Sequence, residues 1–151
     1  MRLEVELVPS GSWGDNLRSR LSASDWRKLS IENAERAGGR CEVCGYKSGK
    51  RRPDCHEIWS YGEDGVQRLE GLIALCTICH KAKHLGRTLT VERVEVRERV
   101  LRRLMEMNGF GVAELEAYIV KVFEEYEERS RRDWVVDVSW LDVKLGKGRV
   151  K

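Results

Sequence analysis

Hydrophobic and charged positions alternate at the start of the chain, where Leu3, Val5 and Leu7 are separated by glutamates. A period of two is typical of a strand with one buried face, so an N-terminal strand is predicted. After a break rich in serine and glycine, Ser24 is a favourable helix N-cap. A rough apolar face then continues to the glycines at residues 38–39, which predicts a first helix.

In the middle of the chain, segments with the strand pattern and segments with the helix pattern follow one another. A strand is predicted over residues 54–60, followed by a turn at residues 61–65. A short apolar run at residues 72–75 comes next. A helix is predicted from residue 77 to about residue 85, with Gly86 as its end because glycine commonly follows the last helical turn.

The last third of the chain has mainly helical periodicity. One helix is predicted over about residues 91–107, and a second has apolar residues at three- and four-residue spacing, which is typical of a face packed on a core. This second face consists of Leu115, Tyr118, Ile119, Val122, Phe123 and Tyr126. Alternation then returns and predicts a terminal strand that could pair with the N-terminal one. Its alternating residues are Trp134, Val136, Val138 and Trp140.

The composition is that of a globular chain. With 151 residues, 41% of them hydrophobic, the sequence suits one domain with its own core. No apolar stretch approaches the ~20 residues that span a bilayer, and glutamates interrupt the N-terminal run, so no membrane span or signal peptide is expected. A cytoplasmic location, where thiols stay reduced, is therefore predicted. A net charge of +3 does not by itself indicate a nucleic-acid partner.

The candidate metal ligands are the cysteines and histidines, all of which lie within residues 41–84. Four cysteines form two Cys-x-x-Cys pairs, the spacing at which two thiolates can turn toward one ion. These are Cys41, Cys44, Cys76 and Cys79. In a reducing compartment this pattern predicts a structural four-cysteine zinc site. Unligated core thiols are the alternative, but they would not explain two such pairs.

Three histidines remain after the zinc ligands are assigned. His80 and His84 are four residues apart, so on a helix both imidazoles project from one face and can share a metal ion. His56 is expected on the strand that precedes this helix. Each histidine also has an ordinary interpretation: His80 as a hydrogen-bond partner of a zinc thiolate, His84 as a surface residue, and His56 as a structural residue.

These residues resemble the zinc-stapled branch of the HNH endonucleases, over about residues 38–87. The resemblance is carried by the two cysteine pairs, by Asp54-Cys55-His56-Glu57-Ile58-Trp59, and by Gly71-Leu72-Ile73-Ala74-Leu75-Cys76-x2-Cys79-His80-x3-His84. It implies an α+β fold with a ββα-metal core and a four-cysteine zinc site. It also implies metal-dependent hydrolysis of DNA phosphodiester bonds. The flanking segments are similar to small uncharacterised bacterial HNH proteins.

The resemblance assigns roles to individual residues. His56 matches the general base, and His80 and His84 match the ligands of a second divalent ion (Mg²⁺, Mn²⁺, Ni²⁺ or Zn²⁺). Cys55 matches a further ligand position, where a thiolate suits Zn²⁺ better than Mg²⁺. Asp54 or Glu57 could replace it, and strand alternation favours Glu57, which shares the face of Cys55.

One position departs from the family pattern. The asparagine that usually fixes the loop orienting the base is replaced by Gly71. Gln67 and Glu70 are nearby polar residues that could take its place.

Basic residues near the cysteine and histidine window are the expected contacts to double-stranded DNA, since Lys and Arg next to a phosphate-directed site provide most of the affinity. They are Lys47, Lys50, Arg51, Arg52, Lys81, Lys83 and Arg87. Trp59 and Tyr61 are expected to pack under the hairpin, with stacking on an unpaired base as the alternative.

The sequence therefore predicts a single α+β domain in three parts. Residues 1–37 form a strand and a helix, residues 38–87 the HNH-like core, and residues 88–151 a pair of helices with a terminal strand. Two other functions stay open because zinc knuckles occur in many classes of protein. One is a non-catalytic nucleic-acid-binding module, and the other is a protein-interaction scaffold in which zinc only stabilises the fold.

Overall fold

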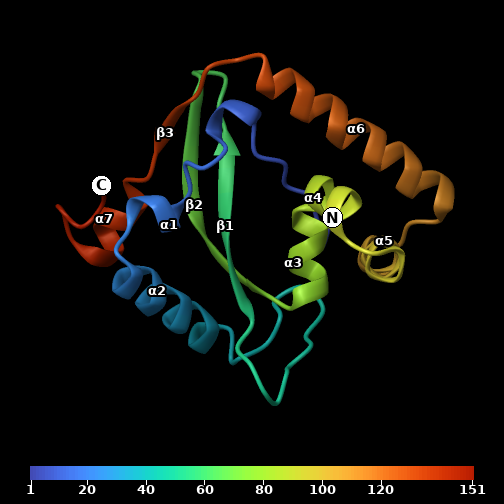
Figure 1. Cartoon of the computed structure of the whole chain (residues 1–151), viewed down its shortest axis with the longest axis horizontal. Helices are drawn as coiled ribbons and strands as arrows, with labels where there is room; N and C mark the ends of the chain where they lie inside the picture. Colours follow the sequence, from blue (N-terminus) through green and yellow to red (C-terminus); the bar gives the residue numbers. More distant parts are fainter.

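A computed structural model describes residues 1–151 and has an α+β fold, with seven α-helices around a small three-stranded sheet (Figure 1). The strands are β1 (Asp54–Tyr61), β2 (Val66–Leu75) and β3 (Val135–Asp137). The helices are α1 (Leu17–Arg20), α2 (Ala23–Arg36), α3 (Thr77–Lys83), α4 (Leu85–Val91), α5 (Val94–Asn108), α6 (Val112–Ser130) and α7 (Trp140–Leu145), and a short 3-10 turn covers Ser10–Ser12. None of these helices is both long and apolar enough to cross a membrane.

Strands β1 and β2 form the long antiparallel hairpin at the centre of the molecule (Figure 1). Ile58 pairs with Gly71 and Trp59 with Leu69, so the register shifts by one residue at Glu70. The extra residue lies on β2, so the bulge changes which face the residues of β2 present on either side of it. The terminal strand β3 pairs in parallel with β2. The prediction that it pairs with an N-terminal strand is therefore wrong.

The predicted N-terminal strand does not form, and residues 3–7 are extended without a strand partner. Within this segment Leu3 is fully buried, whereas Val5 and Leu7 are only half-buried, like Glu6. The backbone groups of the segment bond to helices instead of to a strand. Glu6 N donates to the Lys83 carbonyl oxygen over 3.0 Å, and Val5 N donates to the Tyr118 hydroxyl over 2.8 Å. Because these helix groups satisfy the backbone, no sheet partner is required.

Two helix boundaries differ from the sequence prediction. The N-cap of α2 is Ser22, whose hydroxyl accepts from Asp25 N, and Ser24 lies inside the first turn. Gly86 does not end a helix. The chain breaks at His84, with φ −96° and ψ 48°, and α4 then continues through Gly86. The two predicted C-terminal helices are present as α5 and α6.

The hairpin separates two hydrophobic clusters. In Figure 1, α2 lies on one side of the hairpin and α3 on the other. The larger cluster, on the α3 side, joins the N-terminal segment, α3, α5 and α6, and its fully buried members include Leu3, Leu75, Leu85, Val100 and Leu104. The smaller cluster, on the α2 side, consists of Leu17, Leu21, Leu29, Trp59, Leu69 and Leu141. Packing on both faces holds β1 and α3 in fixed relation, and these two elements carry the histidines.

Candidate metal centres

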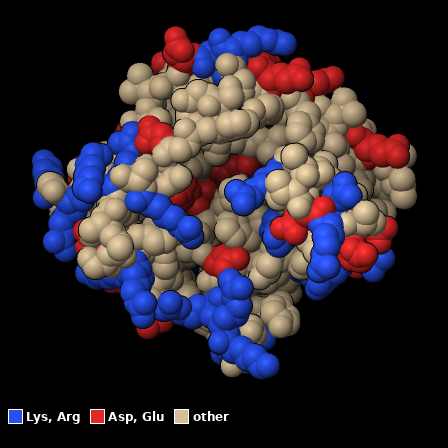
Figure 2. Space-filling model, viewed as in Figure 1, with Lys and Arg blue, Asp and Glu red and all other residues tan.

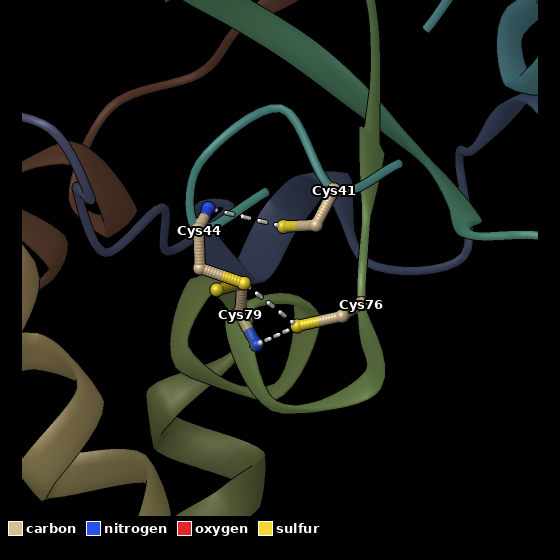
Figure 3. A group of neighbouring side chains, drawn as sticks. All are labelled: Cys41, Cys44, Cys76 and Cys79. Carbon is tan, nitrogen blue, oxygen red and sulfur yellow. Dashed lines mark hydrogen bonds between the residues drawn. The ribbon is translucent and has the colours of Figure 1, made fainter. Parts of the chain in front are cut away.

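The four paired cysteines gather at one point, with their sulfurs turned toward one another (Figure 3). Their sulfurs all lie within 4.8 Å of each other, and Cys44 Sγ is 3.6 Å from Cys76 Sγ. Four thiolates at about 2.3 Å from a tetrahedral ion would lie about 3.8 Å apart. None of the cysteines is in a disulfide. The cluster therefore fits a metal ion such as zinc.

Local backbone geometry produces this convergence. Cys41 and Cys44 lie on a knuckle turn after α2, which Gly45 completes with φ +77°. Cys76 is the N-cap of α3, and its sulfur accepts from Cys79 N over 3.5 Å. Hydrogen bonds among the thiols lower the pKa of Cys41 and raise the pKa of Cys79, and a bound divalent ion would hold all four as thiolates.

An arginine that the sequence analysis did not identify supports the cysteine cluster. Arg103 lies on α5, and its Nη1 donates to Cys79 Sγ over 3.2 Å and to Cys76 Sγ over 3.5 Å. Four thiolates around a divalent ion keep a net negative charge, and a neighbouring guanidinium reduces that charge. No local pattern indicates this role, because Arg103 reaches the cluster only through the packing of α5 against α3.

The three histidines form a second cluster. His56 comes from β1, His80 from α3, and His84 from the residue that follows α3. Their ligand nitrogens lie within 4.8 Å of one another, and His80 Nε2 is 3.2 Å from His84 Nε2. Two imidazoles at about 2.1 Å from one ion would place their nitrogens about 3.0–3.4 Å apart. The arrangement of His80 and His84 therefore fits two ligands of a single ion.

Two carboxylates contact the histidine cluster from outside. Asp54 Oδ2 lies 3.1 Å from His80 Nδ1, and this hydrogen bond holds the pKa of Asp54 below its usual range. Glu6 Oε2 lies 2.9 Å from His56 Nε2. Partial desolvation in the cleft and the neighbouring His56 and His80 lower the pKa of His84, although its side chain stays exposed. His84 is thus neutral at neutral pH, as a metal ligand must be.

Cys55 and Glu57 do not join the histidines. Alternate residues of β1 face opposite sides, so Cys55 lies next to Ser30 and Asn33 of α2, where burial raises the pKa of its thiol to about 11. A neutral thiol of this kind is a poor metal ligand. Glu57 shares that face as predicted, but its carboxylate accepts from Leu17 N over 3.1 Å and from the Trp59 indole over 3.2 Å.

The position that lacks the expected asparagine has no substitute on β2. Gly71 pairs with Ile58, and the space around it is open. Glu70 accepts from the Ser60 hydroxyl instead of contacting a histidine. Gln67 is fully buried opposite Tyr61, at the far end of the hairpin from His56, and its side-chain amide has no hydrogen-bond partner.

The histidines open into a cleft of about 510 Å³. Its lining includes Glu6, Arg18, Trp26, His56, His80, Lys81, His84 and Arg87. A second hollow of about 490 Å³ shares Arg18, Trp26 and His80 and adds Arg51 and Arg52. Figure 2 shows a central hollow with acidic side chains inside it and Lys and Arg side chains around its edge. The charge pattern suits a phosphate chain at the edge and a cation in the centre.

The basic residues named from the sequence have different positions. Arg51, Arg52, Lys81 and Arg87 line the two hollows. Lys81 is paired with Glu92, and Arg51 with Asp54. Lys47 and Lys50 are exposed on the loop before β1, and neither lines a hollow. Arg18 was not identified from the sequence, although it borders both hollows.

A scan against protein-family models found no match for this chain, and searches of curated proteins and of solved structures found none either. Function is therefore inferred from the chemistry of the two ligand clusters and the cleft. The four-cysteine cluster is built to hold a metal ion, and the histidine cluster offers a second, more open set of ligands.

Proposed function

We propose that this protein is a metal-dependent endonuclease of the HNH type, which hydrolyses phosphodiester bonds of DNA. One observation carries the proposal. His56 of β1, His80 of α3 and His84 just after α3 converge in a cleft that Lys and Arg side chains also line. A divalent ion and a proton acceptor beside a phosphate-binding edge are the parts that phosphodiester hydrolysis needs.

The order of elements supports a ββα-metal core. The hairpin β1–β2 leads into α3, so the strand supplies His56, the helix supplies His80, and the residue after the helix supplies His84. We propose that the four cysteines hold Zn²⁺ and staple this core. The second ion is Mg²⁺, Mn²⁺, Ni²⁺ or Zn²⁺, and imidazole ligands favour Ni²⁺ and Zn²⁺.

In the proposed reaction, His56 accepts a proton from a water molecule. The water oxygen forms a bond to phosphorus, and the bond between phosphorus and the 3′ oxygen breaks. That oxygen takes a proton from solvent and His56 returns its proton to solvent, which gives a 3′ hydroxyl and a 5′ phosphate. A bound divalent ion supplies charge stabilisation for the phosphorane and the leaving oxygen. Asp54 orients His80 by holding its Nδ1, which leaves Nε2 as the ligand atom.

We propose that Arg51, Arg52, Lys81 and Arg87, together with Arg18, contact DNA phosphates along the two hollows. Lys47, Lys50 and Lys83, which do not line either hollow, add positive charge. Such contacts give affinity that falls steeply with salt and carries no sequence information.

Nicking of supercoiled plasmid tests the proposal. The protein is incubated with each of the four candidate ions, next to a His56→Ala variant and a Lys121→Ala control on the exposed face of α6. We expect nicking by wild type and the control, and at least a ~100-fold loss in His56→Ala. Retention of the cysteine-held ion shows that each variant is folded.

Three results would contradict all or part of the proposal. Nicking that survives in His56→Ala would remove His56 as the base. Absence of nicking with every ion, combined with salt-sensitive binding, would favour a non-catalytic nucleic-acid-binding module. Absence of both would favour a protein-interaction scaffold.

A further inference from the structure

Glu6 is fixed against His56 by three hydrogen bonds. Its Oε2 lies 2.9 Å from His56 Nε2, and its Oε1 accepts from Trp59 N over 2.9 Å. Its own backbone N–H is held by the carbonyl of Lys83, next to His84. The carboxylate is only 13% exposed and the His56 side chain 6% exposed. This contact connects residues 50 positions apart in the sequence.

The contact determines the tautomer of His56. An ionised carboxylate only accepts hydrogen bonds, so the nitrogen that faces it must carry the proton. His56 Nε2 is that nitrogen, and Nδ1 of the neutral ring therefore keeps its free lone pair. A histidine can act as a base only through the unprotonated nitrogen.

We propose that Glu6 is the positioning residue for His56, holding it in the Nε2–H tautomer so that Nδ1 accepts the proton. This inference rests on the proposed nuclease function. Under this proposal the N-terminal segment orients the base. Strand β2 offers no residue for that role, since Gly71 has no side chain and Gln67 lies at the other end of the hairpin.

The hydrogen bond of the second Glu6 oxygen to Trp59 N allows the tautomer of His56 to be tested with one substitution. In Glu6→Gln the side chain keeps its shape but has one acceptor and one donor. Trp59 N is a backbone donor and retains the amide oxygen. The amide NH₂ then faces His56 Nε2, which must become the acceptor, and the proton moves to Nδ1. Glu6→Gln thus reverses the tautomer without removing a side chain.

Nitrogen NMR of the imidazoles at pH 8, with the cysteine-held ion in place, reports the tautomer of each of the three histidines. We expect Nε2–H for His56 in wild type and Nδ1–H in Glu6→Gln. In plasmid nicking, we expect kcat of Glu6→Gln to fall at least ~100-fold with KM unchanged, because a wrong histidine tautomer in a serine-protease triad costs about 10⁴-fold. Glu4→Gln, at an exposed residue of the same segment, is the control and should change neither result.

Each outcome is decisive. Nδ1–H in wild type, or unchanged Nε2–H in Glu6→Gln, would overturn the inference. A reversed tautomer with unchanged kcat would also overturn it, because Glu6 would then have no catalytic consequence. If wild type does not nick DNA, the nuclease proposal fails, whereas the NMR result still decides whether Glu6 sets the tautomer.

Discussion

Among single residues, Tyr61 shows how burial without a partner affects stability. Its hydroxyl is buried and makes no hydrogen bond, while its ring packs edge-on against Trp134 at 5.2 Å and under the Arg129 guanidinium at 4.5 Å. These contacts agree with the predicted packing role. We expect Tyr61→Phe to be neutral or to stabilise the protein by up to about 1 kcal/mol at pH 7, since only an unsatisfied hydroxyl is removed.

The Tyr61→Phe prediction extends to alkaline pH. Burial raises the pKa of Tyr61 above that of an unfolded tyrosine, about 10. The unfolded chain therefore loses this proton first, and wild type loses stability as the pH rises past 10, whereas Tyr61→Phe does not lose this contribution. Thermal melts at pH 7 and pH 10.5 measure both effects. The matched control is Tyr118→Phe, which should cost about 1–2 kcal/mol at pH 7 because it leaves Val5 N without its acceptor. A loss in Tyr61→Phe equal to that of the control would contradict the prediction.

The residues of the candidate site differ in how far the sequence predicts them. The cysteine pairs are evident from spacing alone, because two intervening residues bring two sulfurs to one ion. His80 and His84 follow from helical periodicity. Glu6 and Arg103 do not follow from any local pattern, because each reaches its partner only through tertiary packing. The sequence around Glu6 shows only an acidic residue that alternates with apolar ones, and such a residue usually lies on the solvated face of a strand.

At the scale of elements, two glycines with different backbone conformations give opposite predictions. Gly86 lies inside α4, and a Cβ there would meet Leu7 and Phe123 at ordinary contact distances of 3.6 and 3.8 Å. We expect Gly86→Ala to stabilise the protein by about 0.5–1 kcal/mol. Gly109 caps α5 with φ +66°, so Gly109→Ala should destabilise by about 1 kcal/mol. Urea denaturation measures both, and a loss in Gly86→Ala would mean that residue 86 ends a helix after all.

The elements predicted best are those with a strong period or a clear stop. The apolar stripe from Leu115 to Tyr126 corresponds to α6, and residues 54–60 to β1. The N-terminal segment has a strand pattern but no strand, because alternation indicates one buried face and does not specify the backbone partner. The break at His84 was missed for a related reason, since glycine is only one of several ways to end a helix.

At the scale of the whole molecule, the cysteine-held ion is expected to determine whether the larger hydrophobic cluster forms. Cys41 and Cys79 are themselves members of that cluster. A structural zinc site contributes about 10–16 kcal/mol, comparable with the total stability of a domain. We expect removal of the ion with a strong chelator to abolish the cooperative thermal transition. Cys41→Ser should have the same effect, as followed by circular dichroism and by metal analysis.

Cys55→Ser is the matched control for this prediction, because its thiol lies beside α2 and outside both ligand clusters. It should retain one cysteine-held ion per chain and melt cooperatively. Loss of that ion in Cys55→Ser, or an unchanged melt after chelation, would show that the fold does not depend on the four-cysteine site.

Helix α3 is seven residues long, and its N-cap is a ligand of one cluster while His80 in its last turn is a ligand of the other. A helix this short has little stability of its own. A newly made chain that has not captured its first ion would therefore have no fixed geometry at its histidines. Under the proposed function, the chain would be harmless to the DNA of its own cell until that capture, and its cutting activity would follow the zinc supply of the cell.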